Sequence, residues 1–139
     1  MQRNIVIIAH DPKKNDLISF LKEREQYLFD RSFICTGRTA DFIEQEKFDF
    51  SVVHLKRGSS GGYLQISEMI SERKIDLVIF LMADQVVSGN HHEDIRKILD
   101  SCVETNTPLA INSASADLLL IGLIRKEQAQ RAREAQNIS

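Results

Sequence analysis

The chain has 139 residues, of which 42% are hydrophobic and 27% are charged. These values are typical of one globular domain with a buried core, and they exclude a second full domain and a disordered, collagen-like or coiled-coil chain. The formal net charge of -2 argues against a nucleic-acid-binding protein, because phosphate contacts usually require a basic excess.

The two cysteines, Cys35 and Cys102, fall in different predicted elements without metal-ligand spacing. We therefore expect two buried thiols rather than a disulfide or a zinc site. The apolar run near the first residues is too short for a secretory signal or a membrane span. A soluble protein of a reducing compartment such as the cytoplasm, with no membrane partner, is expected.

Short β-rich runs alternate with longer segments of helical period, which predicts an α/β fold with a parallel sheet. The predicted strands are Ile5–Ala9, Ser32–Cys35, Phe50–Leu55, Ile75–Leu81 and Leu109–Ile111. The first and fourth runs are almost continuously apolar, so we place them in the middle of the sheet. The predicted fold class is a single three-layer αβα sandwich with a five-stranded parallel sheet.

Five helices are predicted between and after these strands. The first has an apolar face made by Leu17, Phe20, Leu21 and Leu28. The second and third span Ala40–Gln45 and about Gly62–Arg73. The fourth carries the apolar stripe Ile95, Ile98, Leu99, Cys102 and Val103. The fifth begins near Ser113, and residues 125–139 form a charged, solvated extension of it beyond a domain of residues 1–124.

Every predicted strand is followed by a polar loop, and ligands of open parallel sheets bind beyond the carboxyl ends of the strands. The loops contain, in chain order, His10, Asp11, Lys13 and Lys14; Thr36-Gly37-Arg38-Thr39; Arg57-Gly58 with Ser59-Ser60-Gly61-Gly62; Asp84 with His91 to Asp94; and Asn112, Ser113 and Ser115.

Two of these loops, 36–39 and 57–62, precede predicted helices, where free backbone N–H groups and the helix dipole favour a phosphate or carboxylate. Lys14, Arg38 and Arg57 would add full positive charges. Taken singly, each loop also has a structural explanation as a turn or a helix cap, and the arginines have one as groups that face solvent or a subunit interface.

The histidines and aspartates of the loops suggest acid–base chemistry more than metal binding. His10 fits a functional role and a capping role equally well, whereas His54 fits a surface strand position. Adjacent histidines rarely converge on one ion, so we expect no metal at residues 91–94. Asp11, Asp84 and Asp94 would instead supply a general base and a general acid beside a phosphate ester.

The order of the motifs resembles the methylglyoxal synthase family over about residues 4–120. The matching segments are Ile7-Ile8-Ala9-His10-Asp11 with Lys14, Thr36-Gly37-Arg38-Thr39, Arg57-Gly58 before Gly61-Gly62, residues 74–80, His91 to Asp94, and residues 108–116. The resemblance implies a parallel αβα domain, commonly a hexamer. Such a domain binds dihydroxyacetone phosphate, removes a carbon-bound proton and expels phosphate to give methylglyoxal, without cofactor or metal.

The resemblance also implies site residues. Those expected to hold the phosphate-bearing ligand are His10, Lys14, Thr36, Gly37, Arg38, Thr39, Arg57 and Gly58, with His91 on the carbonyl or hydroxyl oxygen. Asp94 and Asp11 match family aspartates, and Asp84 does so if one residue is inserted after the fourth strand.

Three positions depart from the family pattern. Family synthases have Gly-Gly-Asp, with the aspartate as base, where this chain has Gly61-Gly62-Tyr63. Arg38 and Arg57 replace the usual threonine and serine and add positive charge. The family's later phosphate-contacting arginine has no match, and Arg38 or Arg57 would have to compensate for it.

Two functions follow as hypotheses. One is a domain that binds a small phosphorylated metabolite without turnover, because a phenol with a pKa of ~10 is a poor base at neutral pH. The alternative is an active carbon-oxygen lyase in which Asp94, Asp11 or Asp84 is the base. A purely structural subunit of an oligomer would leave the five polar loops without a purpose.

Overall fold

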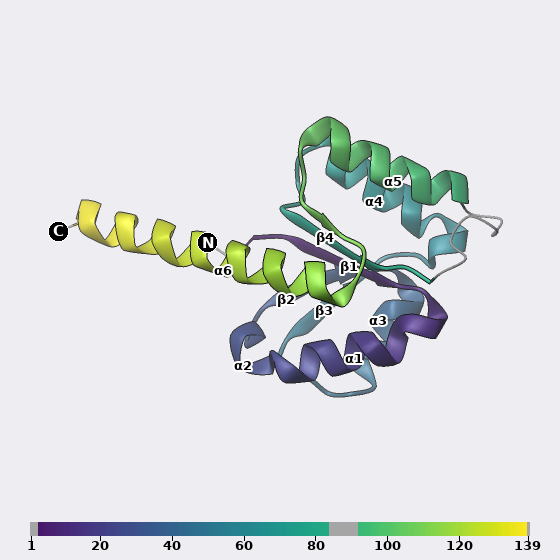
Figure 1. Cartoon of the computed structure of the whole chain (residues 1–139), viewed down its shortest axis with the longest axis horizontal. Helices are drawn as coiled ribbons and strands as arrows, with labels where there is room; N and C mark the ends of the chain where they lie inside the picture. Colours follow the sequence, from purple (N-terminus) through teal and green to yellow (C-terminus); the bar gives the residue numbers. More distant parts are fainter. Residues whose placement is uncertain (1–2, 84–91, 139) are drawn as a thin grey trace.

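Five parallel strands form the centre of the computed structural model, which describes residues 3–83 and 92–138. They lie side by side in the order β3-β2-β1-β4-β5 (Figure 1). Their bounds are β1 Ile5–Ala9, β2 Ser32–Cys35, β3 Ser51–His54, β4 Leu77–Leu81 and β5 Leu109–Ala110. All five predicted strands are confirmed, although the third, fourth and fifth are shorter than the sequence indicates.

β1 and β4 pair along their whole length, from Ile5 with Leu77 to Ala9 with Leu81. All five residues of each strand are buried. Strands covered by helices on both faces bury every side chain, which explains their continuous apolar sequences. The prediction that these two strands lie in the middle of the sheet is confirmed.

Helices cover both faces of the sheet, so the predicted three-layer αβα class is confirmed. α4 and α5 cover one face, and α1, α3 and the first part of α6 cover the other (Figure 1). The bounds are α1 Lys14–Glu23, α2 Glu25–Leu28, α3 Gly37–Glu44, α4 Gly62–Ser71, α5 His92–Thr105 and α6 Ser113–Ile138. Two 3-10 turns, η1 Asp11–Lys13 and η2 Gly58–Ser60, precede α1 and α4.

The first predicted helix is interrupted at Arg24, which has φ -116° and ψ 10°. Its N–H donates to the carbonyl oxygens of Leu21 and Lys22, and the N–H of Tyr27 donates to the carbonyl oxygen of Arg24. The chain therefore enters the short α2 in a new direction, while Leu28 stays fully buried as its spacing predicted.

The inward position predicted for Val103 is wrong, since its side chain is 81% exposed. In a helix with 3.6 residues per turn, a residue eight positions after Ile95 lies about 80° around the axis from it. That rotation places Val103 at the flank of the buried stripe, whereas Ile98 and Cys102 remain inside it. Both cysteines are buried free thiols, as expected.

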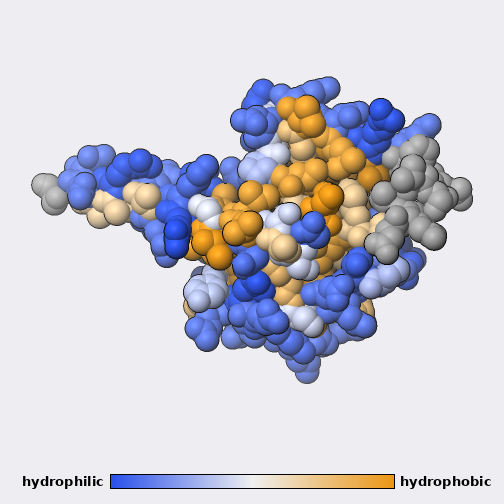
Figure 2. Space-filling model, in the orientation of Figure 1, coloured by the Kyte–Doolittle hydropathy of each residue, from blue (hydrophilic) through white to orange (hydrophobic). Residues whose placement is uncertain are grey.

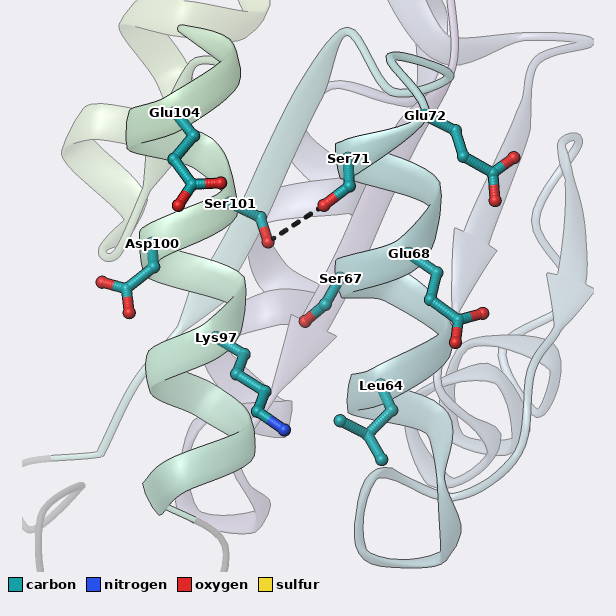
Figure 3. A pocket seen from close by; sticks show the side chains of 9 residues that line it. All are labelled: Leu64, Ser67, Glu68, Ser71, Glu72, Lys97, Asp100, Ser101 and Glu104. Atoms are coloured by element: carbon teal, nitrogen blue, oxygen red, sulfur yellow. Dashed lines mark hydrogen bonds between the residues drawn. The ribbon is translucent and has the colours of Figure 1, made fainter.

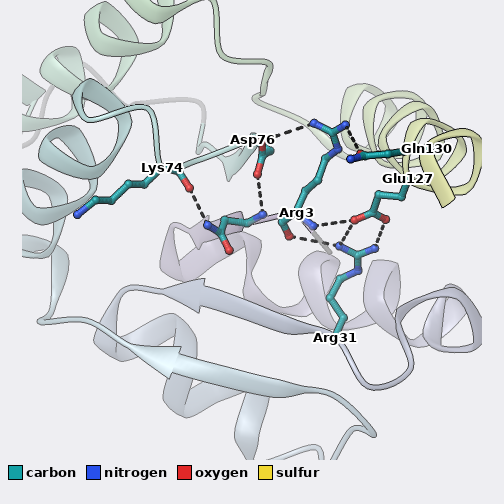
Figure 4. A network of polar contacts seen from close by, with 7 residues as sticks. Arg3, Arg31, Lys74, Asp76, Glu127 and Gln130 are labelled. Atoms are coloured by element: carbon teal, nitrogen blue, oxygen red, sulfur yellow. Dashed lines mark hydrogen bonds and ion pairs between the residues drawn. The ribbon is translucent and has the colours of Figure 1, made fainter. Parts of the chain in front are cut away.

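A buried ion pair attaches α6 to the start of the sheet (Figure 4). The Arg31 guanidinium donates to both carboxylate oxygens of Glu127, at 2.5 and 3.3 Å, and the backbone N–H of Arg3 donates to the same carboxylate at 2.7 Å. Burial opposes ionisation of Glu127, but these hydrogen bonds outweigh it and hold the pKa of that carboxyl below its ordinary value. The segment expected to be a solvated tail therefore contains one buried, structural residue.

Beyond this ion pair α6 projects from the body of the molecule (Figure 1). Residues 131–137 are all exposed. The projecting end is mainly hydrophilic, whereas apolar side chains, including Leu118 and Ile121, are exposed on the earlier part of the helix (Figure 2). Among the helices of the described residues, none is both long and apolar enough to cross a membrane.

Candidate functional site

β1, β2 and β3 are added toward one edge of the sheet and β4 and β5 toward the other, so the strand order changes between β1 and β4, and the residues after these two strands meet there. The His10 N–H donates to the Leu81 carbonyl oxygen at 3.1 Å, and the Ala83 N–H donates to His10 Nδ1 at 2.9 Å. Burial lowers the pKa of His10, and the raising effect of Asp11 does not offset this. The neutral imidazole accepts at Nδ1 and therefore presents Nε2–H as a donor.

Asp11 joins two cations at the end of β1. One carboxylate oxygen accepts from Lys14 Nζ at 2.8 Å, and the other lies 2.9 Å from an Arg38 guanidinium nitrogen. The Lys14 hydrogen bond is the main cause of the lowered pKa of Asp11, and the Arg38 charge adds to it. Lys14 is buried, whereas Arg38 is exposed. Two cations against one carboxylate leave a net positive charge at this edge.

Tyr63 lies beside this cluster, in the first turn of α4. Its ring stacks on Phe80 with centroids 5.9 Å apart, and His10 meets the edge of the same Phe80 ring at 5.1 Å. The ring also covers Gly58, because a Cβ at that glycine would lie 2.4 Å from Tyr63 Cζ. Burial first, and the nearby Asp11 charge second, raise the pKa of Tyr63, so its phenol stays protonated at neutral pH.

The loop after β2 is held tightly inside the fold. The hydroxyl oxygen of Thr39 accepts from the Ala9 N–H and from the Thr36 hydroxyl, each at 3.3 Å, and both threonines are buried. These hydroxyls join α3 to β1. Gly37 lies against the loop after β3, where its added Cβ would be 3.2 Å from Arg57 Cγ.

The predicted site residues after β1, β2 and β3 are thus brought to one edge of the sheet, with His10, Asp11, Lys14 and Arg38 in one contact network. Arg57 is exposed at the start of η2. Asp94 is half-buried in the first turn of α5, beside Ile95, which belongs to the same apolar cluster as Tyr63. Asp84 and His91 lie outside the described residues.

The sequence matches a known family over residues 16–111, under the description MGS-like domain. The chain belongs to the MGS-like domain family. It is 37% identical over 123 residues to methylglyoxal synthase of Borreliella afzelii (strain PKo), with 88% of this chain and 95% of the relative covered. It is also 37% identical over 122 residues to methylglyoxal synthase of Ralstonia nicotianae, and the match covers 88% of this chain and 89% of that relative.

The fold agrees with that of a solved MGS-like protein. The crystal structure of methylglyoxal synthase from Elizabethkingia anophelis NUHP1 superposes with a TM-score of 0.76 at 34% sequence identity, over 86% of this chain and 77% of that chain. The family assignment made from the ordered motifs is therefore confirmed. Activity in this member is a separate question, because it depends on the residues of the site.

Phe80 and the backbone N–H of Ala83 are parts of the site that the sequence did not indicate. Phe80 is one residue of an apolar strand, and nothing in a linear pattern distinguishes it from its buried neighbours. The Ala83 N–H carries no side-chain signal at all. No group of three or more histidine, cysteine, aspartate or glutamate residues is placed to hold a metal ion within residues 3–83 and 92–138.

Replacing Gly62 by alanine should lower the free energy of unfolding by about 1–3 kcal/mol, the usual cost of forcing atoms into a packed site. The added Cβ would lie 2.1 Å from the Lys56 carbonyl oxygen, a backbone atom that cannot rotate away. Gly122→Ala is the matched control, since its Cβ would meet nothing within 4 Å. Urea unfolding of both variants measures the difference, and equal stabilities would contradict this packing.

Proposed function

We propose that this MGS-like protein binds a small phosphorylated metabolite at the carboxyl edge of β1, β2 and β3, without the proton abstraction of methylglyoxal synthases. The observation that carries the proposal is the meeting of Lys14 and Arg38 on Asp11, directly beside the protonated Tyr63.

The binding half of the proposal rests on charge and donors. The network around Asp11 is net positive, and a phosphate can replace or join the carboxylate between Lys14 and Arg38 through charge-assisted hydrogen bonds. The N-terminus of α3 opens at the same edge, with Gly37 as its first residue, and its dipole favours an anion. His10 Nε2–H would donate to an oxygen of the ligand.

The second half rests on the lack of a suitable base at Tyr63. By family resemblance, this position holds the carboxylate that removes the proton. A phenol with a raised pKa is ionised in fewer than about one molecule in a thousand at pH 7. Asp11 is a weak replacement, because its lowered pKa and its two cationic partners make its proton affinity small.

The alternative is an active carbon-oxygen lyase that converts dihydroxyacetone phosphate to methylglyoxal and phosphate. The names of the relatives at 34–37% identity favour it. Asp94 is then the preferred base, because no ion pair with another residue of the described ranges 3–83 and 92–138 would weaken it and it lies beside the cluster that contains Tyr63.

The experiment incubates the purified protein with dihydroxyacetone phosphate and measures methylglyoxal and free phosphate. We expect no turnover by the unmodified protein, and binding seen as a rise in melting temperature. Tyr63→Asp restores a carboxylate at the family base position and should produce measurable methylglyoxal. Tyr63→Asn is the matched control, because asparagine has the same size as aspartate but no carboxylate that could act as a base.

Turnover by the unmodified protein would establish the alternative, and its loss in Asp94→Asn would assign the base. If neither the protein nor Tyr63→Asp reacts, a thermal-shift series of phosphorylated metabolites measures the binding half alone. No shift with any phosphate ester would overturn that half as well.

We further propose that the protein acts in the cytoplasm as a homo-oligomer, which family resemblance makes a hexamer, with no cofactor or metal and with neither nucleic acid nor membrane as a partner. The two buried free thiols fit a reducing compartment. Light scattering of the purified protein measures the number of chains.

A further inference from the structure

A groove runs between α4 and α5 on the side of these helices that faces away from the sheet (Figure 3). Its volume is about 660 Å³. The floor consists of serines: Ser67 and Ser101 are buried, and Ser71 Oγ donates to Ser101 Oγ at 3.5 Å. Because serine side chains are short, another helix can approach α4 and α5 closely along this line.

The rims of the groove are acidic. Glu68 extends from α4, and Asp100 and Glu104 extend from α5, with Lys97 as the cation among the lining residues (Figure 3). Glu72 also lines the groove, but Lys74 Nζ lies 2.6 Å from its carboxylate and neutralises it. Three carboxylates against one ammonium leave the groove negative.

The projecting end of α6 has the opposite charge. Beyond Glu127, which is buried in its ion pair with Arg31, the exposed charged side chains of the described residues are Arg131, Arg133 and Glu134, so this end carries a net positive charge. Ala129, Ala132 and Ala135 recur every three residues along the same segment, and because each is turned by about 60° from the one before, they give one side of the helix small side chains. A helical end of this length is marginally stable in water without a partner.

The two surfaces of one chain lie in different layers of the fold. α6 packs through Ala116, Leu120 and Leu123 into the core on the α1 and α3 side of the sheet. The groove lies on the outer side of the α4 and α5 layer, across the sheet from that core. The end of α6 projects away from the body rather than around it (Figure 1). The α6 end of one chain therefore does not reach the groove of the same chain, whereas the α6 end of another chain can bind in it.

We propose that the acidic groove between α4 and α5 binds the basic projecting end of α6 from a second copy of this protein. The contact is heterologous, because two different surfaces meet, and contacts of this kind close into a ring when the rotation between neighbouring chains allows it, as in the proposed hexamer. This inference is independent of the ligand and of catalysis. It gives the solvent-exposed end of α6 a specific role in assembly.

The test is a charge swap measured by analytical ultracentrifugation at several protein concentrations. Glu68→Lys with Asp100→Lys reverses the groove, and Arg131→Glu with Arg133→Glu reverses the helix end. Each double variant should weaken self-association at least about tenfold, because like charges then face each other. The variant with all four substitutions should regain association, since the charges are again opposite.

Asp16→Lys with Glu23→Lys is the matched control, because it changes charge by the same amount at two exposed carboxylates of α1. It should leave the association unchanged, and circular dichroism checks that all variants fold. A protein that stays a single chain at every concentration overturns the proposal. So does association that survives either reversal, or a fourfold variant that stays dissociated.

Discussion

Replacing Glu127 by glutamine should lower the free energy of unfolding by about 3–5 kcal/mol, the usual loss when one partner of a buried ion pair is removed. Glu127 is 1% exposed and Arg31 is 4% exposed, so the Arg31 charge cannot recover water as a partner without opening the structure. The backbone N–H of Arg3 would lose its charged acceptor in the same change. Chemical denaturation at pH 7 measures the loss.

The matched control for this prediction is Glu134→Gln, at an exposed carboxylate of the same helix that accepts a hydrogen bond from Gln130. Its effect should stay within about 0.5 kcal/mol, as is usual for surface positions. Equal losses for the two variants would contradict a structural role for the buried pair.

The stability of the protein should also depend on pH through the carboxyl group of Glu127. The pKa of Glu127 is lower in the folded protein than in the unfolded chain, so the unfolded chain binds its proton first as the pH falls. The contribution of ionised Glu127 to the free energy of unfolding is complete above its pKa in the unfolded chain, ~4.3. It disappears as the pH falls through its pKa in the folded protein. Stability of the unmodified protein should therefore fall more steeply below about pH 4.5 than that of Glu127→Gln.

Replacing Lys14 by methionine should weaken the binding of dihydroxyacetone phosphate by about 10- to 100-fold. A hydrogen bond to a charged group contributes about 1.5–3 kcal/mol, and methionine keeps most of the volume without the charge. Lys14 Nζ is held on Asp11 in a buried position, whereas the neighbouring Arg38 is exposed and engaged with the other oxygen of Asp11. Isothermal titration calorimetry measures the change.

Lys22→Met is the control for Lys14, since Lys22 lies on the same helix and pairs with Glu46 away from the site. Its affinity for the metabolite should equal that of the unmodified protein. Unchanged affinity in Lys14→Met would show that the ligand does not bind at this edge. The melting temperature without ligand separates lost binding from lost folding.

The strands were predictable because their sequences carry a strong local signal. β1 and β4 are uninterrupted apolar runs, and a run of this kind has one stable place, in the middle of a sheet with helices on both faces. Helix boundaries were less predictable. The break at Arg24 depends on how the chain must turn to bring Leu28 into the core, and no single residue there is a helix breaker.

The candidate site was partly predictable for a topological reason. Residues that follow parallel strands reach the same edge, so His10, Lys14 and Arg38 could be grouped from the sequence. Their partners could not be foreseen: Asp11 was expected as a general acid or base, and the structure uses it to hold two cations. The sequence also did not indicate that the hydroxyls of Thr36 and Thr39, which are expected to bind a ligand, join α3 to β1.

The sequence by itself determined the αβα class, the central strands, the family and the edge that carries the polar loops, because apolar periodicity and motif order are properties of the linear chain. Tertiary structure alone decided which charges meet. Arg31 and Glu127 are 96 residues apart and form a buried pair, and Phe80 contacts both Tyr63 and His10, which lie far apart in the sequence. Such contacts depend on the packing of distant segments, and a local pattern does not encode them.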